Sequence, residues 1–359
     1  MPSSVHIDSY RGWSGGQVQS LGLALALAAR GEEVRFIAQT GSALAERLKG
    51  TYLSGEAIAL RGVAGIGAAF SLARRFLAAE PEIVHIHDSA AVAWGALGAR
   101  MAGGIPVVVT RRTQRPLRGG WLSRVKYGWC DRVICVSEAI KRQHFELGLP
   151  EELLTVIPDF VDCRHFDPGV AGPRDPADPP TMLIMGQMSA DKGHRVLLDA
   201  MHDVVKRVPE ARLRIAGRGE EEPRLRAQVG ALGLAGRVEF AGFLSDVRGA
   251  LAQADVFVQP SLWEGLGLAV LEAMAMAKPV VVSDAGGLPE SVVAGETGLV
   301  VPAGDAGALG EAILFLIRNP DRAREMGEAG RKRALEVYDR PRIVDRILAL
   351  YDDVLSERG

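Results

Sequence analysis

The chain has 359 residues, with 42 lysine and arginine residues against 44 aspartate and glutamate residues, and a formal net charge of −2. This length suits two domains of ordinary size, and a hydrophobic content of 48% supports a core in each. The charge balance argues against a general nucleic-acid-binding protein, because no excess of positive charge is available for phosphates.

The cysteines and the lengths of the apolar runs limit which cellular compartment and which class of protein the chain fits. Cys130, Cys135 and Cys163 fit neither a disulfide framework nor a zinc-ligand spacing, so we expect reduced, interior residues of a cytoplasmic protein. The amino terminus lacks the basic and apolar regions of a signal peptide, and no apolar run approaches 18 residues. We therefore expect neither secretion nor a transmembrane helix.

The first half of the chain alternates strand and helix patterns. A short apolar strand over residues 5–8 is followed by a loop over 9–16 and a helix over about 17–30. Further strands are predicted over 33–38, 82–87, 105–109 and 132–136, separated by helical or irregular segments. Such alternation predicts parallel strands joined by crossover helices, which is a doubly wound sheet.

A second α/β pattern begins after a segment over 167–180 that is dense in Pro, Gly and Asp and is typical of a linker. Strands are predicted over 182–186, 211–217, 237–240, 255–259, 279–284 and 298–301, and the chain from residue 305 is helical, broken near Pro320 and Pro341. We predict two Rossmann-like doubly wound domains facing a cleft, with ligands beyond the carboxyl ends of the strands.

The most informative stretch lies between the strand over 255–259 and the helix that follows it. Glu264 falls in a loop with Gly265 and Gly267, and Glu272 follows on the helix. A loop acid, a helix amino terminus and a helix acid suit a sugar, a diphosphate and a ribose in that order. Each acid alone has a structural alternative, as a helix-capping or exposed residue; their combination favours a sugar-nucleotide site.

Two strand-to-helix loops have features of phosphate binding. Gly15 and Gly16 precede the first helix, and two glycines allow backbone amides to approach an anion, although a tight turn explains them equally well. In the second half, Lys192 sits just before a helix start, where a cation is unfavourable unless an anion offsets it. We favour a phosphate ligand for Lys192 over a solvated surface lysine.

Two other features of the first half suggest contacts with a ligand: a histidine that can donate to a hydroxyl or a phosphate, and a basic segment. His87 ends a predicted strand and faces the expected cleft, whereas His85 is expected to pack in the sheet; a strand-capping role for His87 stays open. No acid occurs between Asp88 and Asp131, while basic residues accumulate there with Trp121 and Trp129. This pattern favours an anionic acceptor or an anionic membrane surface over a merely solvated charge run.

Together these residues resemble a retaining glycosyltransferase of family 4, with the GT-B fold. The resemblance is carried by the Glu264-to-Glu272 segment, the Gly186-to-Gly193 loop, Gly15-Gly16 and His85-Ile86-His87, and it spans nearly the whole chain. The implied domains are an acceptor-binding domain over 1–166, a linker over 167–180, a nucleotide-sugar domain over 181–340, and a final helix over 341–359 that returns to the first domain.

The resemblance also implies roles for single residues. Glu272 would hold the ribose hydroxyls, and Glu264 with the amides of Gly265, Leu266 and Gly267 would hold the transferred sugar. Lys192, Gly15 and Gly16 would contact the diphosphate, with Gln187 nearby, and His87 would contact the sugar or its phosphate. Glu264, His87 and Lys192 are the expected catalytic residues, and Trp13, Arg111, Arg112 and Arg115 the expected acceptor contacts.

The implied reaction moves a hexose-type sugar from a UDP- or GDP-sugar to an envelope glycan or lipid-linked acceptor such as lipopolysaccharide core, with retention of configuration. No Asp-x-Asp pair is present to hold a magnesium ion, so we expect neither a metal nor another cofactor. The expected location is the cytoplasm, with peripheral contact at the inner face of the cytoplasmic membrane.

Two positions depart from the family pattern. Gln187 stands where many members carry Arg, and losing a charge-assisted hydrogen bond of roughly 1.5–3 kcal/mol could slow departure of the diphosphate about ten- to a hundredfold. A cation from the region of Arg111 to Arg118 is a candidate replacement. Thr110-Arg111-Arg112 stands where relatives often have Thr-x-His, which affects the expected acceptor side.

Three alternatives stay open. A nucleotide-sugar 2-epimerase shares the fold, although the spacing of Glu264 and Glu272 argues against it. A Rossmann dehydrogenase is suggested only by Gly217-Arg218-Gly219, which lacks the third glycine of the dinucleotide fingerprint. A non-catalytic sugar-nucleotide-binding protein is supported only by Gln187.

Overall fold

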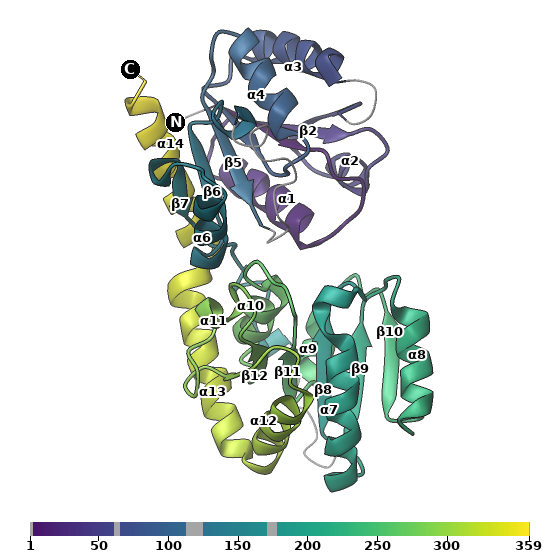
Figure 1. The fold of residues 1–359 in the computed structure, drawn as a ribbon. Coiled ribbons are helices and arrows are strands. Elements are labelled where there is room, and N and C mark those ends of the chain that lie inside the picture. The colour runs from purple at the N-terminus through teal and green to yellow at the C-terminus, as the bar shows by residue number, and fades with distance from the viewer. Residues whose placement is uncertain (1–2, 61–64, 113–124, 171–177, 359) are drawn as a thin grey trace. The chain divides into compact units, whose positions relative to one another are not determined.

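A computed structural model describes residues 3–60, 65–112, 125–170 and 178–358 (Figure 1). The chain divides into two compact units. The first contains Met1–Asp159 together with Pro341–Gly359, and the second contains Phe160–Arg340. Both are Rossmann-like α/β units built on a parallel sheet, as the sequence predicts.

The first unit is built on a seven-stranded parallel sheet of order β3-β2-β1-β4-β5-β6-β7. Its strands are β1 (Ser4–Asp8), β2 (Val34–Gln39), β3 (Ser54–Ile58), β4 (Ile83–Ile86), β5 (Val107–Arg111), β6 (Arg132–Cys135) and β7 (Leu154–Val156). Its helices are α1 (Gly15–Ala28), α2 (Ala43–Leu48), α3 (Gly65–Ala79), α4 (Val92–Met101), α6 (Glu138–Glu146) and α14 (Arg340–Ser356). The sequence pattern missed β3 and β7, since three of the five β3 residues are Ser, Gly and Glu and β7 has only three residues.

The second unit has a six-stranded parallel sheet of order β10-β9-β8-β11-β12-β13. Its strands are β8 (Thr181–Met185), β9 (Arg212–Ala216), β10 (Val238–Gly242), β11 (Val256–Gln259), β12 (Val280–Ser283) and β13 (Leu299–Val301). Its helices are α7 (His194–Arg207), α8 (Glu222–Ala231), α9 (Arg248–Gln253), α10 (Leu268–Ala275), α11 (Leu288–Ser291), α12 (Ala306–Arg318) and α13 (Pro320–Arg333).

Each sheet reverses its strand order at one place. In the first unit β1 pairs with both β2 and β4, so that Ile7 lies between Ile37 and Ile86. In the second unit β8 pairs with both β9 and β11. The loops after the two strands that flank such a reversal lead apart and leave room for a ligand at the carboxyl end of the sheet. Gly15, Gly16 and His87 in the first unit, and Lys192 and Glu264 in the second, lie in or beside such loops.

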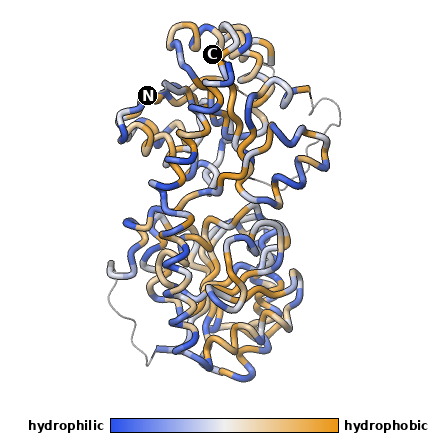
Figure 2. Tube along the Cα trace, turned by 90° about the vertical axis from the view of Figure 1, so that its left-hand side faces the viewer, coloured by the Kyte–Doolittle hydropathy of each residue, from blue (hydrophilic) through white to orange (hydrophobic). Residues whose placement is uncertain are grey.

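Residues of high hydropathy are concentrated along the backbone of the strands inside each unit (Figure 2), and most of these residues are buried. The central strands of a parallel sheet are covered by helices on both faces, so their residues are buried throughout; β4 and β11 have no exposed residue. This burial keeps the strand ends rigid, and the polar side chains that follow them are therefore held in place.

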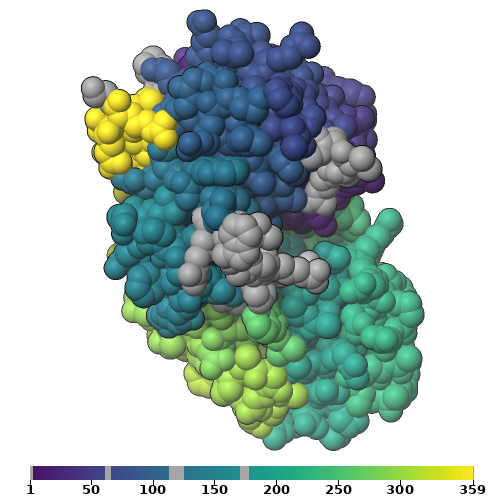
Figure 3. Space-filling view, turned by 45° about the horizontal axis from the view of Figure 1, so that its top comes forward, coloured from purple at the N-terminus to yellow at the C-terminus, as the bar shows by residue number. Residues whose placement is uncertain are grey.

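The final helix, α14, belongs to the first unit, and its last residues lie on that unit's surface in Figure 3. The hydroxyl of Tyr351 lies 2.6 Å from Nδ1 of His85 in β4, and Arg358 pairs with Asp131. Val161 forms a β-bridge with Asp339, and Arg331 donates a hydrogen bond to the carbonyl of Phe166. Residues from Phe160 onward therefore belong to the second unit. The expected linker 167–180 lies partly outside the described residues.

Candidate active site

The loops at the carboxyl ends of β8 and β11 are packed against each other. The amide of Leu262 donates to the carbonyl of Asp191 at 2.7 Å, which joins the two loops directly. Gly193 has a φ of +69°, and a Cβ atom there would lie 1.8 Å from the carbonyl oxygen of Pro260. Only glycine permits both the backbone conformation and this approach. The loops are therefore held at one fixed spacing, with Lys192 beside that glycine.

Lys192 and Glu264 meet across this junction. The Lys192 Nζ atom lies 2.7 Å from Oε2 of Glu264, and their side chains are 23% and 15% exposed. The hydroxyl of Ser261 also approaches the same carboxylate oxygen, at 3.3 Å. An ammonium group has three N–H donors, so Lys192 keeps donors for a phosphate while it binds Glu264. Two residues that the sequence assigns to neighbouring parts of one ligand are thus brought together.

The amino terminus of α10 lies immediately beyond Glu264. Gly267 is its N-cap, with a φ of +92°, and a Cβ atom there would come 2.6 Å from the side chain of Leu288. Within the described residues the buried amides of Leu266 and Gly267 make no hydrogen bond. Unpaired buried amides at a helix start are suited to an anion or a sugar hydroxyl oxygen.

Glu272 lies on α10 and is half-buried. Its carboxyl group has no hydrogen-bond partner among the described residues, and burial raises the pKa of the group to about 8. A buried carboxyl without a partner is costly unless a ligand supplies one. Glu272 is therefore a ligand-binding candidate on structural grounds as well.

Gln187 lies at the start of the same β8 loop and is exposed. Its backbone carbonyl accepts a hydrogen bond from the amide of Ser189 at 2.9 Å. The side chain is uncharged, so Lys192 is the loop's cation between Gly186 and Gly193. The second unit thus offers one positive charge to an anion at this loop.

In the first unit, Gly15 and Gly16 are the first two residues of α1, so this helix begins two residues earlier than predicted. The N-cap hydroxyl of Ser14 donates to Oε1 of Gln17 rather than accepting from an amide, and Gln17 in turn binds Asp8 at the end of β1. Trp13 lies under the guanidinium of Arg47, which is 3.9 Å from the ring centre. The first amides of α1 are thus left without a side-chain cap.

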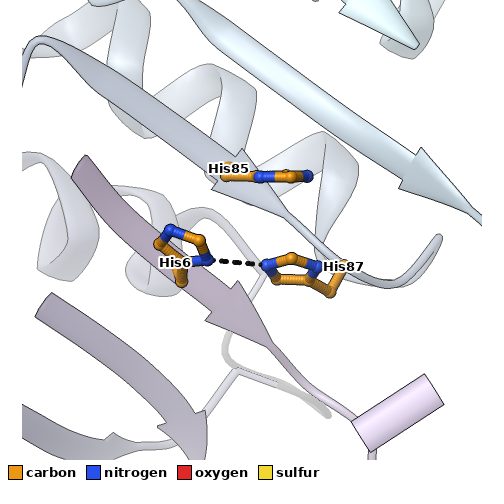
Figure 4. A group of neighbouring side chains, drawn as sticks. All are labelled: His6, His85 and His87. Carbon is orange, nitrogen blue, oxygen red and sulfur yellow. Dashed lines mark hydrogen bonds between the residues drawn. The ribbon is translucent and has the colours of Figure 1, made fainter. Parts of the chain in front are cut away.

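His6, His85 and His87 form a stack at the junction of β1 and β4 (Figure 4). Nδ1 of His6 lies 2.9 Å from Nε2 of His87, and the rings of His85 and His87 stack with centroids 4.2 Å apart. Burial, as the main cause, lowers the pKa of His6 to about 3 and holds the pKa values of His85 and His87 well below their usual range. All three imidazoles are therefore neutral near pH 7.

This cluster has the composition of a metal site but not the geometry. One nitrogen from each ring lies within 4.8 Å of the others, yet every ring nitrogen already has a partner. His6 binds Ser4, His85 binds Thr110 and Tyr351, and His87 lies beside Arg112. Stacked rings direct their lone pairs along nearly parallel planes, whereas a metal needs them to converge. The arrangement fits a hydrogen-bonded stack.

The two arginines at the end of β5, Arg111 in the strand and Arg112 just after it, have different surroundings. Arg111 is buried, and its Nε atom donates to Nε2 of His144 at 3.1 Å, so it lies in the interior rather than where an acceptor would meet it. Arg112 donates through Nε to Asp159 at 2.7 Å and remains 12% exposed. The remaining expected acceptor contact, Arg115, lies outside the described residues.

Sequence reasoning did not find Asp159, His6 or Tyr351. Each has a site contact far away in the chain: Asp159 with Arg112, His6 with His87 and Tyr351 with His85. No local pattern identifies these contacts. The only available signal was the presence of histidines in or just after β1 and β4, the strands that flank the order reversal. From strand periodicity alone, such histidines are interpreted as residues packed in the sheet.

No helix in the described part of the chain has the length and hydropathy needed to cross a bilayer.

Comparison with known proteins identifies the family of this chain. The model described as Glycosyltransferase Family 4 matches residues 13–165, and the model described as Glycosyl transferases group 1 matches residues 171–333. A phosphatidyl-myo-inositol mannosyltransferase of Mycobacterium leprae is 32% identical over 95% of this chain and 94% of that protein. The chain belongs to the group 1/family 4 glycosyltransferases.

Two further proteins are similar to this glycosyltransferase. The lipopolysaccharide core biosynthesis glycosyltransferase LpsE of Rhizobium meliloti is 33% identical over 61% of this chain and 64% of its own length. The structure of Anabaena Alr3699/HepE in complex with UDP superposes with a TM-score of 0.86 at 20% identity, covering 98% of this chain and all of that one. This likeness shows the GT-B fold.

Proposed function

We propose that this glycosyltransferase transfers a hexose-type sugar from a UDP- or GDP-sugar to a lipid-linked or envelope glycan acceptor, with retention of configuration and without a metal ion. The observation that carries the proposal is Glu272, a half-buried carboxyl group without a partner, on the helix that starts beside the Lys192–Glu264 pair. A donor would supply the missing hydrogen bonds through its ribose hydroxyls.

Each part of the donor then has a complementary group. The ribose diol donates to Glu272, the diphosphate accepts from Lys192, and the transferred sugar donates to Glu264 and accepts from the amides of Leu266 and Gly267. Because Glu264 already holds Lys192 at 2.7 Å, the distance between sugar and phosphate contacts is set before the donor binds. We expect Gly15 and Gly16 to bind the diphosphate through backbone amides.

In the transfer step the bond between the anomeric carbon and the phosphate oxygen breaks, and its electron pair goes to the leaving nucleoside diphosphate. The acceptor oxygen bonds to the same face of that carbon and passes its proton to the leaving phosphate oxygen. The protein's contribution is to stabilise the charge that develops on the diphosphate, through N–H donors that are already in place.

The acceptor proposal rests on the relatives. One of them is named for phosphatidyl-myo-inositol and another for lipopolysaccharide core, and both names point to a lipid-linked acceptor. We therefore propose a site of action in the cytoplasm, with peripheral contact at the inner face of the cytoplasmic membrane.

The proposal is tested first by ligand binding. UDP-, GDP-, ADP- and dTDP-sugars are screened by thermal shift, and the best donor is incubated with and without acceptors such as lipopolysaccharide core and phosphatidylinositol, with EDTA present. We expect stabilisation by one nucleotide class and release of the nucleoside diphosphate, and nuclear magnetic resonance of the first product shows whether the anomeric configuration is retained.

A matched pair of variants ties the activity to the site. Glu272→Gln should weaken donor binding, whereas Glu296→Gln, at an exposed glutamate of the same unit, should not. Epimerisation of the donor without any acceptor, or tight binding without turnover across the acceptor panel, would contradict the proposed reaction.

A further inference from the structure

Arg112 is the first residue after β5, and its side chain reaches the start of α1. A Cβ atom placed on Gly16 would lie 4.0 Å from Cδ of Arg112. Arg111, its neighbour in the chain, is buried and binds His144 instead. Of these two arginines, therefore, only Arg112 reaches Gly16.

The guanidinium of Arg112 is held on two sides. Nε donates to Oδ1 of Asp159 at 2.7 Å, and both of these side chains are 12% exposed. Nη1 lies 3.5 Å from Nδ1 of His87, at the outer limit of a hydrogen bond. Arginine can only donate, so Nδ1 of His87 accepts, and the hydrogen of the neutral ring lies on Nε2 and points to His6. His87 thus positions Arg112 without adding a charge.

This arrangement leaves donors of the guanidinium unused. Within the described residues Nη2 of Arg112 makes no hydrogen bond, and the first amides of α1 have no partner inside the helix. Neither Gly15 nor Gly16 has a side chain that would keep an oxyanion away from these groups. A phosphate oxygen beside Gly16 can therefore meet a backbone amide and a guanidinium fork together, which is the geometry that arginine provides best.

We propose that Arg112 binds a phosphate of the sugar nucleotide beside Gly16, with Asp159 and His87 as the residues that position it. This inference rests on the proposed function, since it names a residue of the first unit that binds the diphosphate of the same donor. The sequence suggested two roles for Arg112, as an acceptor contact and as one of the candidate cations for the diphosphate, and this inference assigns it the second. As the bond to the anomeric carbon breaks, its N–H groups stabilise the electron pair received by the phosphate oxygen.

The test compares Arg112→Gln with Arg112→Lys and with Arg100→Gln, which removes the same charge from an exposed residue near the end of α4. The measurements use the best donor of the nucleotide-sugar screen and its nucleoside diphosphate product. For Arg112→Gln we expect kcat to fall about ten- to a hundredfold and the Kd of the nucleoside diphosphate to rise about tenfold, because one charge-assisted hydrogen-bond partner is lost.

Three further measurements distinguish this ligand-binding role of Arg112 from a purely structural role. The Kd of the free nucleoside and the KM of the acceptor should stay within twofold of wild type, Arg112→Lys should recover part of the lost kcat, and Arg100→Gln should behave as wild type. If Arg112→Gln folds poorly by circular dichroism, Arg112→Lys carries the test, and its Kd for the nucleoside diphosphate must then rise while that of the nucleoside does not.

Two results would overturn the inference. One is wild-type affinity for the nucleoside diphosphate in both Arg112 variants; the other is a raised acceptor KM with unchanged donor parameters, which would make Arg112 an acceptor residue. Failure of the proposed function is a separate outcome, because there the wild-type protein itself neither binds nor turns over any sugar nucleotide.

Discussion

The two units each present a cation–carboxylate pair beside a glycine, but the pairs are built differently. In the second unit Lys192 binds Glu264, and both residues lie in loops that hydrogen-bond to each other. In the first unit Arg112 binds Asp159, which lies 47 residues along the chain, with a buried histidine on the other side. Both pairs join segments that are far apart in the chain, since Lys192 and Glu264 are separated by 72 residues. They differ because Lys192 and Glu264 each lie in a local motif that can be identified from the sequence, whereas Asp159 does not.

The glycines beside the two pairs, Gly193 and Gly16, differ in how strongly the fold requires them. A Cβ atom on Gly193 would collide with a backbone carbonyl at 1.8 Å, whereas one on Gly16 would make only ordinary contacts at 3.8 and 4.0 Å. Gly193 is therefore required by the fold of the second unit. The fold of the first unit does not require glycine at position 16. The missing side chain therefore leaves room for a ligand there. The following predictions test this contrast, in order of decreasing expected effect.

The largest effect is expected at the Lys192–Glu264 pair. Lys192→Ala should lower kcat by about a hundred- to a thousandfold, because it removes the phosphate cation and leaves the carboxylate of Glu264 unpaired. Lys206→Ala, at an exposed lysine of α7, provides the control. The kcat values are measured by steady-state kinetics with the best donor. A wild-type kcat in Lys192→Ala would contradict the assignment of Lys192 and Glu264 to the proposed site.

The second prediction contrasts the two glycines. Gly193→Ala should lower the free energy of unfolding by about 3 kcal/mol or more, since backbone has to move in a φ-positive turn. Gly16→Ala should leave unfolding in urea within about 0.5 kcal/mol of wild type and weaken nucleoside diphosphate binding about tenfold. Equal destabilisation by both changes would show that Gly16 is structural.

The third prediction concerns the pH dependence set by Glu272. Its pKa is raised to about 8, so between pH 4.5 and 8 the unfolded chain loses a proton that the folded protein keeps, and stability falls as the pH rises. The partial exposure of the side chain limits this loss to about 1–3 kcal/mol. Glu272→Gln should remove it, and the difference in free energy of unfolding between variant and wild type should grow from pH 5 to pH 8.

The same group predicts proton release on donor binding. Ribose hydroxyls donate to the ionised carboxylate and lower its pKa, so affinity should rise with pH up to about 8 in the wild type only. Calorimetry in buffers of different ionisation enthalpy measures the released protons. Proton uptake, or the same release in Glu272→Gln, would contradict the assignment of this residue to the ribose.

The smallest effect is expected at α14. Tyr351→Phe removes the hydroxyl that meets Nδ1 of His85 and should lower the free energy of unfolding by about 1 kcal/mol, with donor binding unchanged. Tyr52→Phe, at an exposed tyrosine whose hydroxyl binds the carbonyl of Leu25, is the control. A loss of donor affinity in Tyr351→Phe would show that the histidine stack transmits changes to Arg112.

Much of the fold was predictable because long apolar strands alternate with helices. Three of the four residues in β4 and in β11 are large and apolar, whereas the short β7 and the polar β3 lack that signal and were missed. The boundary near residue 166 was placed by composition, whereas the units divide after Asp159, because Val161 and Phe166 bind residues late in the second unit.

The residues of the candidate site also fall into two groups, those that local sequence patterns predict and those that only the structure reveals. The sequence by itself determined the positions of Lys192, Glu264 and Glu272, because glycine-rich loops and helix starts are local features whose chemistry depends on neighbouring residues. Only the tertiary structure decided that Glu272 has no partner, that Arg111 turns inward to His144, and that Arg112 lies beside Gly16 with Asp159 and His87. Burial and partner choice depend on contacts between residues far apart in the chain, and no local pattern of residues encodes them.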